Sequence, residues 1–171
     1  MSAAQRLRHL CLFAALPFSA AAGTEPEVYF SRSDPVEQKI VREIDGTRKS
    51  IHLLIYSFTD EKLETALLRA AGRGVDVKIV FDKSQTQEKH SLADTMLAEL
   101  GPKRVEFRTG RGRGIMHEKM AVYDGADVSL GSFNWTANAR DNNWENIIFL
   151  HDLRLATACE HEFQRVWSTR E

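Results

Sequence analysis

The chain has 171 residues, of which 43% are hydrophobic and 27% are charged. This length and composition fit one soluble domain with a hydrophobic core, and they require no second domain. The formal net charge is −1. A globally basic protein is therefore excluded, and any affinity for a polyanion must come from a local patch of basic side chains.

The first 22 residues differ in character from the rest of the chain. Arg6 and Arg8 precede an apolar run at 10–18, and small residues follow at 19–22. This order is typical of a secretory signal peptide. A membrane anchor is the alternative, but the run is shorter than the roughly 20 residues that a spanning helix needs. We therefore expect export to the periplasm and a single mature domain at 23–171.

Removal of this leader would change the charge and the thiol content. It would leave 21 of the 23 basic residues and all 24 acidic ones, a formal charge of −3. Cys11 would be lost, so Cys159 would have no partner for an intrachain disulfide. Because Cys159 falls in an apolar helical stripe, we expect a buried thiol.

In the first half of the mature chain, strands and helices are predicted to alternate. The expected elements are a strand at 28–30, a helix at 34–46 capped by Asp34, a strand at 51–57, a helix at 59–74 and a strand at 75–81. The apolar run at 51–57 is nearly continuous, which indicates a strand buried on both faces. Strand, helix and strand in succession imply a right-handed crossover and a parallel pair.

The second half adds a hairpin and a closing helix. A polar segment at 82–90 is predicted to be an exposed loop, followed by a helix near 91–100 and a strand at 105–108. Strands on either side of Gly125 should form the hairpin, followed by a strand at 144–150 and an amphipathic helix through Trp167. This pattern predicts an α/β fold with a mixed, mostly parallel sheet sandwiched between helices.

The stretch after the glycine-rich segment at 109–114 carries the chemistry. In an extended strand, His117 and Lys119 point to the same face. A neutral imidazole can attack phosphorus, and an ammonium can hold a phosphoryl oxygen. Ser132 and Asn134 repeat the two-residue spacing at the end of the next strand, where a hydroxyl and an amide could donate to the same phosphate. The chain has no spaced cluster of Cys or His for zinc, so we expect no metal and no cofactor.

The spacing from His117 and Lys119 through Asp124 to Ser132 and Asn134 resembles the HKD signature of the phospholipase D superfamily. The strand, helix and strand at 51–81 and the Trp144-Glu145-Asn146 segment are similar to the small secreted bacterial nucleases of that superfamily. The resemblance covers nearly all of the mature chain. It implies a metal-independent phosphodiesterase with a phospholipase D-like catalytic domain.

The resemblance also implies roles for individual residues. His117 corresponds to the nucleophile that forms a covalent phosphohistidine, and Lys119, Ser132 and Asn134 correspond to phosphate ligands. Glu145 matches the carboxylate that orients the histidine. Asp124 completes the signature, but its place before a turn suits a structural role as well as a catalytic one.

The signature occurs once, whereas the family mechanism uses one histidine as the nucleophile and another as the acid. The resemblance therefore implies a twofold homodimer with a composite active site. Arg108, Arg111 and Arg113 precede the signature and could form a basic rim for a nucleic-acid backbone, or merely a solvated loop. Trp135 and Trp144 could stack on bases or belong to the core.

The signature does not choose the phosphodiester. We expect a periplasmic endonuclease of low specificity for DNA or RNA. The alternative enzyme is a phospholipase D that hydrolyses headgroup esters such as phosphatidylcholine, with a cardiolipin hydrolase as a variant. A protein that binds phosphate backbones without turnover is the third possibility.

Overall fold

The computed structural model describes residues 25–85, 105–110 and 114–169, with only the backbone described at 105–110. The predicted signal peptide at 1–22, the predicted helix near 91–100, Arg111 and Arg113 lie outside the described residues. Most of the predicted loop at 82–90 lies outside them as well.

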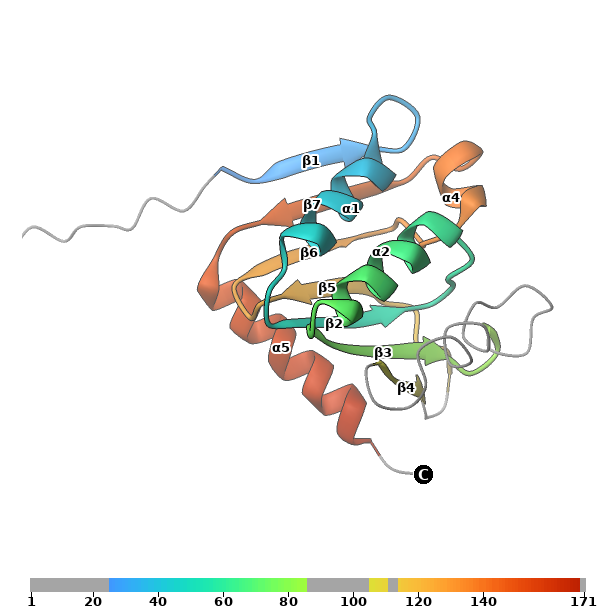
Figure 1. The fold of residues 1–171 in the computed structure, drawn as a ribbon. Coiled ribbons are helices and arrows are strands. Elements are labelled where there is room, and N and C mark those ends of the chain that lie inside the picture. The colour runs from blue at the N-terminus through green and yellow to red at the C-terminus, as the bar shows by residue number, and fades with distance from the viewer. Residues whose placement is uncertain (1–24, 86–104, 111–113, 170–171) are drawn as a thin grey trace, which may run out of the picture.

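The described chain folds around a seven-stranded sheet with the order β1-β7-β6-β5-β2-β3-β4 (Figure 1). In chain order, the strands are β1 (Glu27–Phe30), β2 (Ser50–Ile55), β3 (Asp76–Asp82), β4 (Val105–Gly110), β5 (Lys119–Tyr123), β6 (Asp127–Gly131) and β7 (Asn146–Leu150). The helices are α1 (Val36–Gly46), α2 (Glu61–Gly72), α4 (Ala137–Asp141) and α5 (Leu153–Ser168).

The predicted mixed sheet between layers of helices is confirmed, with one refinement. In this sheet, parallel pairing is confined to β2 with β3 and β3 with β4. The other neighbouring pairs are antiparallel: β2 with β5, β5 with β6, β6 with β7 and β7 with β1. By pairing, the described sheet is therefore mostly antiparallel, although β5 and β7 alone run against the other strands.

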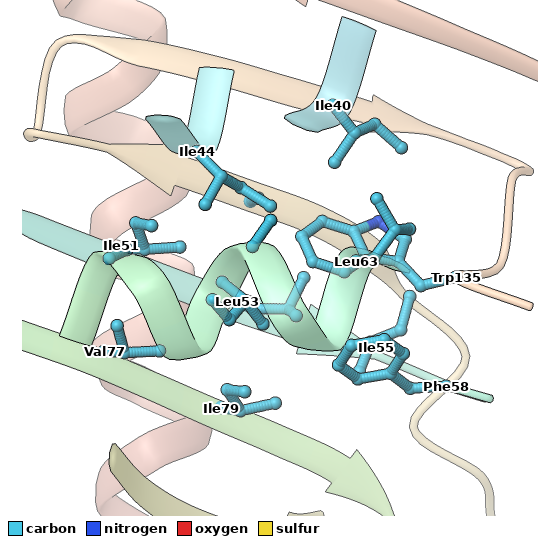
Figure 2. Packing of buried hydrophobic residues seen from close by; sticks show 14 of the residues in the cluster. Ile40, Ile44, Ile51, Leu53, Ile55, Phe58, Leu63, Val77, Ile79 and Trp135 are labelled. Carbon is cyan, nitrogen blue, oxygen red and sulfur yellow. The ribbon is translucent and has the colours of Figure 1, made fainter. Parts of the chain in front are cut away.

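Two apolar cores lie on opposite faces of the sheet, because neighbouring residues of a strand point to opposite sides. Ile51, Leu53 and Ile55 of β2 belong to the cluster that contains the buried residues of α1 and α2 (Figure 2). Leu54 belongs to the second cluster, which contains the buried side chains of α5. The prediction that β2 is buried on both faces is confirmed. Cys159 lies in the α5 core and is buried, and burial raises the pKa of its thiol.

The predicted helices that correspond to α1, α2 and α5 are confirmed, but one predicted cap is wrong. Asp60 caps α2, since its carboxylate accepts from the backbone N–H groups of Lys62 and Leu63. Asp34 does not cap α1. Its carboxylate instead accepts from the backbone N–H of Phe30, and α1 begins at Val36 after Pro35. The short helix α4 was not predicted.

One edge of the sheet collects the strand ends that matter for function. The pairing places the last residues of β2, β3 and β6 beside the first residues of β5 and β7. In Figure 1 this edge is at the right, where the arrows of β2 and β3 end. Side chains from connections far apart in sequence therefore meet at this edge.

Candidate active site

His117 and Lys119 lie where the chain enters β5. The hydrogen bond from the Tyr56 N–H to the Glu118 carbonyl, 3.1 Å long, continues the pairing with β2 beyond the strand. The ring of Tyr56 contacts both side chains. Its centroid lies 4.6 Å from that of the His117 imidazole and 5.0 Å from Lys119 Nζ. The common contact agrees with the expectation that His117 and Lys119 share one face.

The two side chains differ in their exposure. His117 is exposed, and its imidazole makes no hydrogen bond with a described residue. Lys119 is only 8% exposed, and its ammonium donates to the His117 carbonyl over 2.7 Å. Burial lowers the pKa of Lys119, although the Glu145 carboxylate opposes this shift. Among the described residues, no carboxylate forms an ion pair with Lys119, so its charge is available to an anion.

Asp82, at the end of β3, holds the segment that leads to His117. Its carboxylate accepts from the Met116 N–H at 2.6 Å and from the N–H and hydroxyl of Ser84. Burial alone would raise the pKa of Asp82. The hydrogen bonds from Ser84 and Met116, with the nearby His117, outweigh burial and keep this pKa below its usual value. Asp82 is therefore an ionised anchor one residue before the imidazole.

Ser132 follows β6, where β6 and β7 approach each other closely. A Cβ on Gly131 would lie 2.3 Å from the Asn146 carbonyl oxygen, so only glycine fits at this position. The Ser132 hydroxyl donates to Glu145 at 2.5 Å and accepts from the Asn146 N–H at 3.1 Å. The Ser132 hydroxyl, which the sequence analysis assigned to a phosphate, thus donates to Glu145 in this structure.

Asn134 belongs to a loop that is tied to the connection between β2 and α2. Its side-chain oxygen accepts from the Ser57 N–H at 3.4 Å. The next residue, Trp135, is 2% exposed and packs edge to face on Phe58, as Figure 2 shows. Because the oxygen of Asn134 is held by the backbone, its amide N–H₂ group is left to donate. Trp135 is a core residue and no stacking platform.

Glu145 lies beside Ser132, and its predicted bond to His117 is absent. In the described part of the chain, its two carboxylate oxygens accept from Ser132 and from the Asn143 side chain, the latter at 2.9 Å. Within the described chain Glu145 bonds Ser132 instead of His117, and its role in orienting the imidazole stays a prediction. The physical reason is that β6 and β7 are neighbours, so the start of β7 faces the end of β6.

Asp124 lies at the opposite end of β5 from Lys119. Its carboxylate accepts from the backbone N–H groups of Arg48, Lys49 and Ser50 over 2.6 to 3.2 Å. Burial would raise the pKa of Asp124, but these hydrogen bonds outweigh it and lower the pKa. Within one chain this geometry supports a structural role for Asp124, and a catalytic role stays a prediction.

The predicted basic rim is only partly placed. Arg108 lies in β4 and pairs with Val80 of β3, and the two strands end at the same edge of the sheet. The side chain of Arg108 is not described. Trp144, in contrast, is 86% exposed and directly precedes Glu145. In the described regions, no three His, Cys, Asp or Glu side chains gather as a metal site would require. Likewise, no described helix combines the length and the apolar surface needed to cross a bilayer.

Sequence reasoning missed Tyr56 and Asp82. Tyr56 was counted within a buried strand, and Asp82 was counted as the first residue of a loop. Their common signal is position, since polar residues at the carboxyl ends of neighbouring parallel strands meet at one edge of a sheet.

Comparisons with known proteins agree on one family. Residues 40–167 match the family model described as "Cardiolipin synthase, PLD-like domain". The solved structure of Nuc from Salmonella typhimurium, described as a phospholipase D family member, is 33% identical. It superposes with a TM-score of 0.75 and covers 84% of this chain and 95% of that one. NucT from Helicobacter pylori is 26% identical, with a TM-score of 0.69 and the same coverage.

Two curated relatives carry other names. Mitochondrial cardiolipin hydrolase of Drosophila melanogaster is 37% identical, over 75% of this chain and 57% of the relative. Phospholipase D of Rickettsia bellii is 38% identical, over 68% of this chain and 56% of the relative. The chain therefore spans little more than half the length of these relatives.

Proposed function

Since the chain belongs to the phospholipase D superfamily, we propose that it is a phosphodiesterase that acts through a covalent phosphohistidine, most specifically a periplasmic endonuclease of low sequence specificity. One observation supports this proposal above the others. The buried ammonium of Lys119 forms no ion pair with a carboxylate of the described residues, and it lies beside the exposed imidazole of His117, which makes no hydrogen bond with them. Such a pair suits a ligand that brings both a negative charge and an electrophilic centre.

In the proposed first step, the neutral imidazole of His117 attacks phosphorus. An N–P bond forms, the bond from phosphorus to the leaving oxygen breaks, and that oxygen takes a proton from a second, protonated histidine. Water then attacks phosphorus and breaks the N–P bond, and the second histidine, now neutral, takes the proton of the water. Lys119 and the Asn134 amide hold phosphoryl oxygens throughout. A bound phosphate would also replace Glu145 as the acceptor of the Ser132 hydroxyl.

The second histidine is proposed to be His117 of a second copy. The signature supplies a single histidine, and the imidazole is exposed rather than covered by its own chain. A twofold homodimer would bring two such imidazoles to one phosphate. Specific activity should then fall when the protein is diluted below the dissociation constant of the dimer. Sedimentation at the same concentrations should show the matching change in mass, and an active monomer would contradict the composite site.

Nucleic acid is favoured as the substrate by the placement of basic residues. Strand β4, which contains Arg108, ends at the site edge with Gly110, and Arg111 and Arg113 follow Gly110 closely in the sequence. The proposed backbone contacts of Arg108, Arg111 and Arg113 would be electrostatic and would weaken with salt. The similarity to Nuc also extends over 95% of that chain.

The second candidate is a phospholipase D acting on headgroup esters. Relatives named phospholipase D and mitochondrial cardiolipin hydrolase support this candidate directly. The same covalent intermediate would serve either substrate, so the site chemistry does not separate them.

One assay with parallel substrates tests these proposals. The mature chain is incubated with plasmid DNA, RNA and vesicles of phosphatidylcholine or cardiolipin, with a chelator present. Nicking that survives chelation and is lost in His117→Ala supports the nuclease. Headgroup release without nicking would replace it with the phospholipase, and binding of DNA without turnover would leave a phosphate-backbone binder.

A further inference from the structure

We propose that a groove formed by Trp144, Arg32 and Phe30 binds one unpaired nucleobase next to the scissile phosphate, so that the enzyme prefers single strands. This inference deepens the proposed nuclease function and rests on it. The superfamily signature contains none of these three residues.

The groove opens beside the candidate site. It has a volume of about 480 Å³ and is lined by Phe30, Arg32, Ser33, Trp144, Glu145 and Asn146. Glu145 and Asn146 also hold Ser132 at the site. The groove and the proposed phosphate site therefore share a wall, and a nucleotide chain bound at one continues directly into the other.

Two aromatic side chains are left uncovered in this groove. Trp144 is 86% exposed and Phe30 is 53% exposed, whereas the other tryptophans, Trp135 and Trp167, are buried. Folding does not require Trp144 to be aromatic, since its ring buries little surface in the chain. A large exposed aromatic side chain beside a catalytic site is a surface on which a base can stack.

Hydrogen bonds to the backbone hold the guanidinium of Arg32 at one side of the groove. Its guanidinium donates to the carbonyl oxygens of Asp141 and Asn142, at 2.8 and 3.4 Å, and lies 5.7 Å from the centre of the Trp144 ring. Figure 1 shows the loop after β1, which carries Arg32, beside α4. No carboxylate of a described residue forms an ion pair with Arg32. The groove thus joins a flat apolar surface to an uncompensated cation, which complements a base attached to an anionic backbone.

The same geometry indicates why the base must be unpaired. Stacking on Trp144 requires the face of a base to be free, and in a duplex both faces of each internal base are covered by neighbouring pairs. A phosphate at Lys119 could be reached in either form. The groove therefore adds affinity for single strands without specifying a sequence.

A substrate with one cleavable bond tests the groove. An oligonucleotide is made in which a single phosphodiester is flanked by uncharged methylphosphonate linkages, with the nucleotides on either side carrying a base or an abasic sugar. We expect kcat/KM to fall about tenfold or more when the base that enters the groove is removed. Trp144→Ala should abolish this difference, and Trp144→Phe should retain most of it.

Leu153→Ala is the matched control, because Leu153 is 68% exposed and begins α5 after β7, at the opposite edge of the sheet. Its ratio between base-bearing and abasic substrates should equal that of the wild type. If Trp144→Ala and the wild type show the same ratio of kcat/KM between base-bearing and abasic substrates, the base-binding groove is contradicted but the proposed nuclease activity is not. Failure of the wild type to cleave any nucleic acid would overturn both.

Fluorescence gives a readout that does not depend on turnover. In a His117→Asn background, single-stranded oligonucleotides should quench the emission of the exposed Trp144, and Trp144→Phe should remove the quenching. Persistent quenching in Trp144→Phe would assign the signal to Trp135 or Trp167 and overturn the proposal.

The proposal would also be contradicted if the groove held a second subunit or a lipid instead of a nucleobase. If Trp144→Ala becomes monomeric in sedimentation and regains activity at high protein concentration, the groove is a contact between subunits. If vesicles of phosphatidylcholine or cardiolipin shift the Trp144 emission to the blue and Trp144→Ala loses only headgroup release, the groove contacts lipid.

Discussion

The two ends of the β5–β6 hairpin carry parts of the same signature but use their charges in opposite ways. At the site end, Lys119 is buried and its ammonium bonds only to the carbonyl of His117 among the described residues. At the turn end, Asp124 is held by three backbone N–H groups. Burial lowers the pKa of Lys119, whereas the pKa of Asp124 is lowered because hydrogen bonds outweigh burial.

We expect this difference to separate function from stability within one motif. A buried charge without a counter-ion costs free energy of folding, and it is retained where it can bind something else. A carboxylate satisfied by backbone donors stabilises the fold and has little capacity left for a ligand. Substitutions at the site end should therefore reduce activity with little loss of stability, and substitutions at the turn end should do the reverse.

The largest effect is expected from His117→Asn. Asparagine keeps a polar side chain but cannot form the covalent intermediate, so kcat/KM should fall by about 10⁴-fold or more. The melting temperature should hardly change, because the imidazole is exposed and makes no hydrogen bond with a described residue. Steady-state kinetics and calorimetry on the same preparation measure both quantities.

A trapping experiment provides the control for His117. Wild-type protein quenched in alkali during turnover of a labelled substrate should retain the labelled phosphoryl fragment of that substrate. Acid should release the fragment, because the N–P bond of a phosphohistidine is labile in acid. The variant should retain none. Labelling of the variant at the wild-type level would show that another residue is the nucleophile, and it would contradict the catalytic role proposed for His117.

Lys119→Met should lower activity while keeping or raising stability. Loss of the cation should reduce kcat/KM by about 10²- to 10³-fold, and the free energy of unfolding should stay equal or rise by up to about 1 kcal/mol. The folded state holds the Lys119 proton less tightly than the unfolded state does. The free-energy cost of burying the charged Lys119 is therefore fully present at neutral pH. It disappears as the pH rises through the folded and then the unfolded pKa of Lys119. Chemical unfolding at pH 7 and in the alkaline range measures this, and marked destabilisation by methionine would contradict the comparison.

The sequence predicted most of this arrangement because the signals are local. The helix at 59–74 was predicted from its apolar helical period, and the strand at 51–57 from its continuous apolar run. His117, Lys119, Ser132 and Asn134 were proposed from their spacing, and the pairing of β5 with β6 places them near the facing ends of a hairpin. Residues two apart in extended chain share a face whatever the rest of the fold does.

Contacts between distant segments could not be predicted. Asp82 reaches the Met116 N–H across 34 positions, and only the pairing order of the sheet brings them together. Glu145 was expected to bond His117. In the structure its carboxylate accepts from the Ser132 hydroxyl, which lies at the end of the neighbouring strand. Helix α4 has five residues, too few for a period to be read.

Asp82→Asn should produce a moderate effect at the site end. An amide offers one acceptor oxygen where the carboxylate offers two, so the anchor of Met116 weakens and the imidazole is less well positioned. We expect kcat to fall about tenfold, with a smaller change in KM. Asp76→Asn is the matched control at the other end of β3, where the carboxylate bonds Lys78 and should not affect turnover. Equal losses in both variants would indicate general damage to β3 instead of positioning.

Asp124→Asn should have the smallest effect on activity and a measurable effect on stability. Asp124 has a φ of 53°, which asparagine tolerates, so this variant removes the charge without backbone strain. We expect kcat/KM within about twofold of the wild type and a free energy of unfolding lower by about 1 to 2 kcal/mol. Asp124→Ala should cost more, because it also loses the acceptors and places alanine at positive φ.

The acid dependence of stability tests the same assignment of Asp124. Its folded pKa lies below the unfolded value, so its stabilisation is fully present above the unfolded pKa of about 3.9 and is lost as the pH falls through the folded pKa. The gap in stability between wild type and Asp124→Asn should therefore be constant from pH 7 to about pH 5 and close below it. A variant that loses turnover at unchanged stability would instead return Asp124 to the catalytic machinery. The two ends of the hairpin would then no longer divide function from stability.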